Sequence, residues 1–344
     1  MTRPPLNLVL TLGLLAAAAC GENTTPTEPG AAGGLSPAAT SHPWTPNTWT
    51  AKAPLPGPSP GGAFGVAAGV ANNSAGQPIL YALGGTDGNG GCGFNVQAYN
   101  LATNTWTAKK STVAQFNTNG VGKIGGKLYF SGGYEYCSGS RLDFPHLWAY
   151  DVASDRLIRK ADMPKATADG VTGVINGKLY VLPGTWDTTP IRQLFRYDPV
   201  ANTWTTLAQA PHFHANGVGG VIHGKFYVAG GSSVFQSDNS INSTSLDVYD
   251  PWSNTWRTLA PLPAPRVRSA GAIQNSKLWV IGSNGSDRRT FAYDPVTNRW
   301  TTRAPLPVGG ATEAAAPIND SQSHILVVGG GTTEKPAPSE LYTP

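Results

Sequence analysis

The sequence predicts an all-β fold in which six four-stranded antiparallel sheets form the blades of a closed β-propeller. Three observations predict it. Glycine (42 residues) and proline (29 residues) are abundant, and charged residues are only 13% of the 344 residues, as in a chain with many short strands and turns. A Tyr and a Trp recur at a fixed interval, and apolar runs that end in Gly-Gly recur beside them. Self-similarity of this kind is typical of a repeat architecture.

The composition also excludes several classes of protein. Aromatic residues make up 9% of the chain, whereas disordered chains contain few of them. Only two methionines are present, and no leucine periodicity indicates a helical bundle. The formal net charge of +4 is spread without runs of Lys or Arg, so we expect no nucleic-acid partner.

Each repeat begins with two short strands. A run of Gly, Ala and other small residues predicts the innermost strand, because small residues permit crowding around a narrow axis. A short apolar run predicts a second strand that is buried on both faces, and its closing glycines favour unusual φ values or a close backbone approach. The second-strand runs are ILYALGG (79–85), KLYFSGG (127–133), KLYVLPG (178–184), KFYVAGG (225–231), KLWVIGS (277–283) and ILVVGG (325–330).

The recurring Tyr lies on the predicted third strand and the Trp on the predicted outer strand. The segment between them has turn chemistry, with Asp-Pro-x-x-Asn as its commonest form, so the two strands are expected to form a tight hairpin. The broad Trp ring is expected to pack against the neighbouring blade. The hairpins start at Tyr99, Tyr150, Tyr197, Tyr249 and Tyr293, and Leu157 replaces the Trp in the second of them.

The strand count predicts how the ring closes. The sixth outer strand occurs on the N-terminal side, around Trp49, whereas the last repeat stops at a third strand around Leu341 and Tyr342. We therefore expect the strand near Trp49 to pair with the strand near Tyr342. This pairing completes a six-bladed ring and hides the edges that would otherwise promote aggregation.

These repeats resemble kelch repeats, in which a Gly-Gly pair, a Tyr and a Trp follow one another at set spacing. The resemblance covers residues 44–344, and it implies a six-bladed kelch β-propeller. Departures from the pattern are Leu157, the pairs Pro183-Gly184 and Gly282-Ser283, and the missing Tyr in the last second strand. They weaken single blades and leave the fold prediction unchanged.

Residues 1–19 predict a lipoprotein-type signal peptide. Arg3 supplies a positive charge, and the apolar stretch Leu6–Ala19 is too short to span a bilayer comfortably. The segment AAAC that ends at Cys20 resembles a lipobox, with Ala where Leu is commoner, and this resemblance implies that Cys20 is lipidated. An ordinary Ala-x-Ala cleavage site followed by an incidental Cys is the alternative.

Residues 20–43 are expected to hold the lipidated Cys and a flexible linker. They contain no aromatic residue, so they cannot bury enough apolar surface to fold alone. We expect a monomeric protein that is attached to a membrane through its N-terminal lipid. Its predicted location is the cell envelope, at the outer membrane or in the periplasm if the cell is Gram-negative.

One end of the predicted ring, which we call the loop face, carries the connections from second to third strands and from each blade to the next. These connections vary in length on a constant scaffold, which favours a binding role. Arg residues just before the innermost strands suit bidentate contact with a carboxylate of a sugar or peptide. A ring of solvated loop ends is the alternative. The predicted ligand-binding residues at the channel mouth are Asn117, Asn119, Asp169, His212, His214, Asn216, Arg266, Arg268 and Glu313.

Two further features concern His and Cys. His212 and His214 could face one way on a strand and hold one metal ion, but no third ligand is close in sequence, so we expect two loop histidines and no metal or other cofactor. Cys92 and Cys137 both lie in predicted loops of consecutive blades. In an exported protein such a pair is expected to form a disulfide, which would link the two blades.

These observations predict an interaction module for a glycan, peptide or envelope protein. No nucleophile elbow, His-Glu-x-x-His or phosphate loop indicates catalysis. A carbohydrate-active enzyme is the alternative, because kelch families include sialic acid mutarotases and copper oxidases resembling galactose oxidase. Arg266, Arg268 and Glu313 suit an acidic sugar, but no mutarotase motif is matched. The residue types of the oxidases occur here without that family's spacing, at Tyr134, Tyr136, Cys137, His212 and His214.

Overall fold

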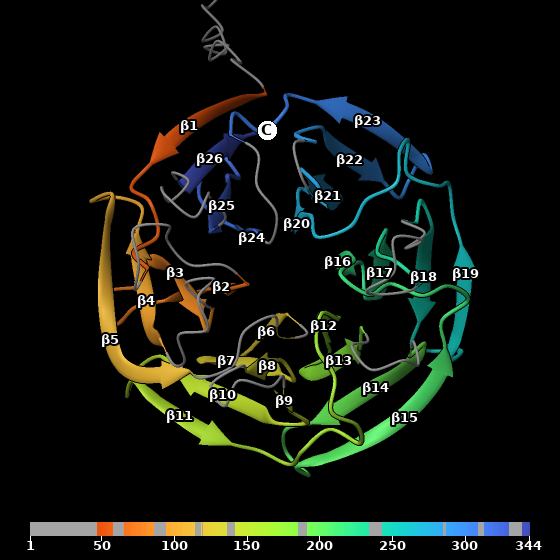
Figure 1. Ribbon diagram of the computed structural model, residues 1–344, viewed down its shortest axis with the longest axis horizontal. Helices are drawn as coiled ribbons and strands as arrows, with labels where there is room; N and C mark the ends of the chain where they lie inside the picture. Colours follow the sequence, from red (N-terminus) through yellow and green to blue (C-terminus); the bar gives the residue numbers. More distant parts are fainter. Residues whose placement is uncertain are drawn as a thin grey trace, which may run out of the picture. The chain divides into compact units, whose positions relative to one another are not determined.

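Six four-stranded antiparallel sheets are arranged as a ring of blades (Figure 1), which confirms the predicted fold. The computed structural model describes residues 47–57, 65–85, 94–113, 118, 120–135, 142–184, 191–233, 243–284, 287–308, 313–329 and 339–344. All of them belong to one unit, Thr45–Pro344. The predicted signal peptide, Cys20 and the linker lie outside the described residues.

Each blade runs from an innermost to an outer strand, as the repeats predict. From the inside outward, the blades are β2 (Ala67–Asn72), β3 (Pro78–Leu83), β4 (Phe94–Asn100) and β5 (Thr105–Val113); β6 (Val121–Ile124), β7 (Lys127–Ser131), β10 (Leu147–Asp151) and β11 (Arg156–Arg159); β12 (Val171–Ile175), β13 (Lys178–Leu182), β14 (Gln193–Asp198) and β15 (Thr203–Gln209); β16 (Val218–Ile222), β17 (Lys225–Ala229), β18 (Leu246–Asp250) and β19 (Thr255–Thr258); β20 (Ala270–Gln274), β21 (Lys277–Ile281), β22 (Thr290–Asp294) and β23 (Arg299–Arg303); and β24 (Glu313–Pro317), β25 (Ile325–Gly329), β26 (Ser339–Thr343) and β1 (Thr48–Lys52).

One further strand pair was not predicted. β8 (Tyr134–Glu135) and β9 (Leu142–Asp143) form a two-stranded antiparallel ladder in the connection between β7 and β10. The described elements are all strands, and none of the described segments is an apolar helix long enough to cross a membrane.

The hydrophobic core lies between adjacent blades. The second strands are buried almost throughout, as β13 shows, where only Lys178 is partly exposed. Outer strands such as β15 are exposed along most of their length. One core cluster joins Tyr129 and Leu147 of one blade to Leu179 and Val181 of the next, so each blade completes the core of its neighbour.

In every blade except the one with Leu157, the Tyr, the turn Asn and the Trp of the repeat connect two blades. Tyr197 Oη donates to Asn202 Oδ1 at 2.6 Å, and the same oxygen accepts the backbone N–H of Ala161 at 3.0 Å. Trp204 Nε1 donates to the carbonyl of Ala161 at 2.8 Å. Because Ala161 follows the outer strand of the preceding blade, one repeat satisfies both backbone groups of a residue in the blade before it. This explains the fixed interval between Tyr and Trp.

The blade with Leu157 keeps part of this connection. Asp155 stands in the Asn position, accepts from Tyr150 Oη at 3.0 Å and accepts the backbone N–H of Lys110 at 2.8 Å. Leu157 has no side-chain N–H to donate, but Ser111 Oγ donates to the carbonyl of Asp155 at 2.9 Å. A side-chain hydroxyl from the preceding blade thus supplies an additional inter-blade bond where the Trp is missing.

The two ends of the described chain share a sheet. β1 pairs with β26, and Trp49 lies opposite Tyr342. The connection seen between other blades is repeated here: Tyr342 Oη donates to Asn47 Oδ1 at 2.7 Å, and Trp49 Nε1 donates to the carbonyl of Ala304 at 3.0 Å. The blade that contains both ends is therefore built by the same contacts as the others.

Small residues line the centre of the ring. A cavity of 560 Å³ is lined at the end away from the loop face by residues such as Gly76, Pro78 and Asn319, and a second cavity of 190 Å³ is lined toward the loop face by Gly120, Gly170 and Ser269. Both cavities are also lined by inner-strand residues such as Ala68 and Gly219. The inner strands therefore surround a central channel, as their small residues predicted.

A substitution at Gly219 of the innermost strand β16 tests how tightly this strand packs. A Cβ added at Gly219 would clash with the carbonyl oxygen of Tyr227 and lie 2.8 Å from Val171 Cγ1. We expect Gly219→Ala to lower the free energy of unfolding by about 1–3 kcal/mol, the usual range for overpacking. Gly126 has open space around its Cβ position, so Gly126→Ala is the matched control. Urea denaturation measures both variants, and equal stabilities would contradict the expectation.

Candidate functional site

Three of the predicted channel-mouth residues, which belong to three consecutive blades, are linked by backbone hydrogen bonds. Asp169, Asn216 and Arg268 each lie two residues before an innermost strand and have φ values of 59°, 56° and 52°. Asn216 N donates to the carbonyl of Asp169 at 2.7 Å, and Arg268 N donates to the carbonyl of Asn216 at 2.9 Å. The left-handed conformation is tolerated by Asp and Asn but is uncommon for Arg. The sequence did not indicate this conformation.

The cavity on the loop-face side is lined by their neighbours. Gly170, Gly217 and Ser269, each one residue further along, line the 190 Å³ cavity together with the first residues of the inner strands. Asp169 is buried, and Asn216 and Arg268 are partly exposed. The described mouth of the channel is therefore bordered by small side chains and backbone.

Several predicted residues cannot be placed. Asn117, Asn119, Tyr136, Cys92 and Cys137 lie outside the described residues, so the predicted disulfide stays a prediction. Glu313 is the first residue of β24.

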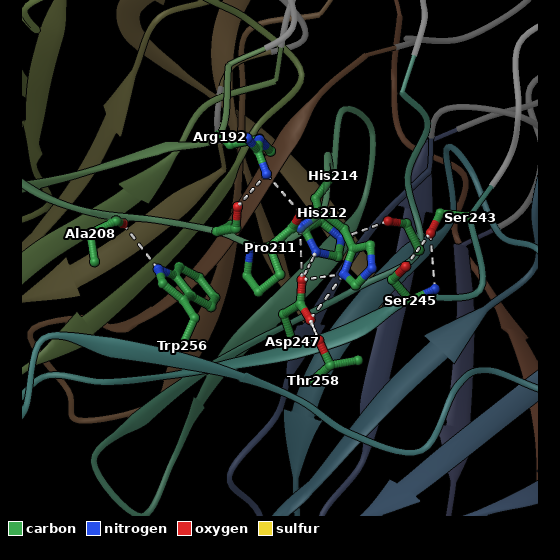
Figure 2. A network of polar contacts seen from close by, with 12 residues as sticks. Arg192, Ala208, Pro211, His212, His214, Ser243, Ser245, Asp247, Trp256 and Thr258 are labelled. Atoms are coloured by element: carbon green, nitrogen blue, oxygen red, sulfur yellow. Dashed lines mark hydrogen bonds and ion pairs between the residues drawn. The ribbon is translucent and has the colours of Figure 1, made fainter.

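The structure brings His212 and His214 together with a residue that the sequence analysis missed, Asp247 (Figure 2). The side chain of Asp247 at the beginning of β18 is fully buried. His212 Nδ1 lies 2.9 Å and His214 Nε2 lies 3.0 Å from Asp247 Oδ2. The other oxygen, Oδ1, accepts from Thr258 Oγ1 at 2.7 Å. Burial raises the pKa of Asp247, but hydrogen bonds from His214, Thr258 and His212 outweigh it, so its pKa lies below the usual value.

The two histidines differ in exposure and in the use of their ring nitrogens. His214 is buried, and its Nδ1 lies 2.7 Å from the carbonyl oxygen of Gly230, which can only accept. Both ring nitrogens of His214 are thus engaged, which does not favour metal binding. His212 has a side chain that is 45% exposed. Within the described ranges, no group of three or more His, Cys, Asp or Glu side chains could hold a metal ion.

Arg266 lies one blade further along the ring, four residues before β20, where His214 lies four residues before β16. Its side chain is only 1% exposed, and Nη1 donates to Asp287 Oδ2 at 2.6 Å and to the carbonyl of Pro265 at 2.9 Å. The guanidinium lies over the ring of Phe291, with 4.7 Å from Cζ to the ring centroid. Nε and Nη2 have no hydrogen-bond partner in the part of the chain that the structure describes.

The guanidinium groups of Arg266 and Arg289 both form an ion pair with the carboxylate of Asp287. Arg289 Nη2 also lies 2.5 Å from Asp287 Oδ2. The hydrogen bond from Arg289, together with the charge of Arg266, holds the pKa of Asp287 well below its usual value, although burial acts in the opposite direction. Burial lowers the pKa of Arg266. Two guanidinium groups thus share one carboxylate, and the cluster keeps an excess of positive charge.

Comparison with known proteins gives the same repeat class. A family model described as the kelch motif matches residues 166–211 and 215–263. Beta-scruin of Limulus polyphemus is 27% identical over 192 residues, which is 54% of this chain and 21% of that protein. Kelch-like protein terF of Aspergillus terreus is 28% identical over 190 residues, which is 54% of this chain and 32% of that protein. The matched region therefore covers a third or less of these curated relatives.

A solved structure described as "Structure of YjhT" has the same fold. It matches with a TM-score of 0.65 and 18% identity, over 83% of this chain and 95% of that chain. At this identity the likeness concerns the fold alone, which agrees with the six blades described above.

Proposed function

We propose that this chain, a six-bladed β-propeller with kelch repeats, is an exported, lipid-anchored module that binds an acidic group of its partner on the loop face. Kelch propellers generally serve in protein interaction. Export and the lipid anchor are proposed from the sequence of residues 1–43 alone. The acidic group would belong to a peptide, an envelope protein or an acidic glycan.

Arg266 is the single observation that carries the acidic-group proposal. Its guanidinium is buried, and two of its three nitrogens lack a hydrogen-bond partner among the described residues. A buried donor without an acceptor is costly, by about 1–3 kcal/mol or more for a charged group. A ligand carboxylate would supply acceptors in the planar geometry that a guanidinium prefers. Arg289 beside it adds positive charge to the same cluster.

Arrays of acidic peptides and of sialylated or uronic-acid glycans, probed with the purified mature chain, test this proposal. We expect Arg266→Met to lose binding by about tenfold or more, in keeping with the loss of a charge-assisted hydrogen bond. Arg299→Gln, at an exposed position of β23, is the matched control and should bind like the wild type. Because Arg266 is buried, the thermal transition of each variant is measured alongside. Unchanged binding by a folded Arg266→Met protein would reject the proposal.

A further inference from the structure

We propose that His212 and Asp247 form a hydrogen-bond-accepting site on the loop face, in which His212 Nε2 accepts a hydrogen bond from a hydroxyl group of a ligand. The proposal does not rest on Arg266 or on the anion site described above.

Asp247 departs from both neighbouring blades at a position where the fold does not require a charge, since the six blades carry Gln97, Trp148, Phe195, Asp247, Phe291 and Glu340 there. It lies two residues before Tyr249, and Phe195 and Phe291 occupy the corresponding positions two residues before Tyr197 and Tyr293. The strand registers agree, since each of the three residues lies opposite a Thr of the outer strand and a Val of the second strand. The two neighbouring blades thus bury an aromatic ring where this blade buries a carboxylate.

His214 shows the same kind of departure. Thr167, four residues before β12, is the corresponding residue of the preceding blade and is equally buried. The pair His214 and Asp247 therefore stands where that blade has Thr167 and Phe195. Burying a charged pair gives little net stability compared with apolar packing, so stability alone does not account for this pair.

His212 is the exposed member of the group. The carboxylate of Asp247 already accepts from His214 Nε2, from Thr258 Oγ1 and from the backbone N–H of His212 at 3.2 Å. The ring of His212 adds a further hydrogen bond, through Nδ1, while nearly half of the side chain stays exposed. The buried carboxylate is thus largely satisfied without this ring, and the ring gains a fixed orientation from it.

The hydrogen bond decides which nitrogen of His212 is available. Because a carboxylate accepts, Nδ1 carries the proton and donates it, and in the neutral ring Nε2 then has a lone pair. No described residue forms a hydrogen bond with this Nε2. A buried carboxylate that orients a histidine in this way is the arrangement by which proteins make an imidazole accept a proton from a hydroxyl group.

The backbone around His212 is also held in place. Arg192 Nη1 donates to the carbonyl of Pro211 at 2.9 Å (Figure 2), and its Cζ lies 5.2 Å from the centroid of the Phe213 ring. The residues on both sides of His212 are therefore anchored by one arginine of the blade before β16. A side chain oriented by a carboxylate on an anchored backbone is preorganised for binding.

Imidazole nitrogen NMR on the whole mature chain tests the site without knowledge of the ligand. We expect the neutral ring of His212 to carry its proton on Nδ1, with Nε2 unprotonated. The double variant His214→Thr, Asp247→Phe installs the pair of the neighbouring blade, so it should fold, and it should lose this fixed tautomer. A neutral wild-type His212 protonated on Nε2 would overturn the proposal.

Chemical reactivity gives a second measurement. Diethyl pyrocarbonate acylates the unprotonated nitrogen of a neutral imidazole, and the hydrogen bond from Nδ1 to the Asp247 carboxylate makes Nε2 of His212 more basic. His212 should therefore be modified faster than the exposed His223 in the turn between β16 and β17. This advantage should be lost in the double variant. Equal rates for His212 and His223 in the wild type would count against an oriented acceptor.

The ligand class is tested on a glycan array, whose ligands are rich in hydroxyl groups. His212→Phe keeps a ring but removes the acceptor, and we expect it to lose the binding signal. A signal that depends on Arg266 and not on His212 would overturn this proposal while leaving the proposed anion site intact. A signal that depends on His212 and not on Arg266 would support this proposal and reject the proposed anion site.

Discussion

Asp247→Ala is expected to lower the free energy of unfolding by about 3–5 kcal/mol, because it removes one partner of a buried charged pair. His214 would stay buried with Nε2 facing a void, and Thr258 Oγ1 would lose its acceptor. Denaturation in urea, followed by intrinsic fluorescence, measures the change.

Two variants make this result specific. Asp250→Ala, three residues further along β18, removes a carboxylate that pairs with Lys225 at the surface, and we expect a loss of about 1 kcal/mol or less. The double variant His214→Thr, Asp247→Phe should recover most of the stability, since the neighbouring blade folds with Thr167 and Phe195. A stability of Asp247→Ala close to that of the wild type would show that the buried hydrogen bonds contribute little.

Trp49→Ala is expected to lower the free energy of unfolding by about 3 kcal/mol, at the lower end of the range for large aromatic side chains. Trp49 is half-buried, packs against Tyr342 with 4.8 Å between ring centroids and donates a hydrogen bond to Ala304. The substitution removes contacts that hold β1 to β26. Because these strands come from opposite ends of the fold, no short connection in the sequence keeps them together once these contacts are lost.

Trp252 offers a matched control for the same substitution. Its side chain is 97% exposed at the tip of the turn between β18 and β19, so Trp252→Ala should change stability by about 0.5 kcal/mol or less. If both variants had the same free energy of unfolding, the contacts of Trp49 between β1 and β26 would contribute no more to stability than an exposed side chain in a turn.

Much of the fold could be predicted because each blade repeats its signals within a short stretch of sequence. Small residues marked the inner strands, and the fixed interval from Tyr to Trp marked the outer hairpins. The contact of each Trp with the neighbouring blade was also predicted, although its acceptor was not. That acceptor is a backbone carbonyl, such as that of Ala161, and every residue type carries one.

The candidate site was predicted only in part. His212 and His214 were singled out, but their partner Asp247 lies 35 and 33 residues away in sequence, and no local pattern connects them. Alignment of the repeats would have found it, since Asp247 replaces the Phe of both neighbouring blades. The left-handed backbone at Arg268 had no signal in the sequence, because Arg rarely adopts that conformation.

The sheet shared by β1 and β26 can form only late in the synthesis of the chain. Its hydrogen-bonded side chains Asn47 and Tyr342 are 295 residues apart, so the ribosome has to release nearly the whole body before this sheet can form. Contacts of such sequence separation slow folding. Until then β1 has no partner strand, so newly made molecules depend on rapid completion of the ring, or on a chaperone, to escape pairing with one another.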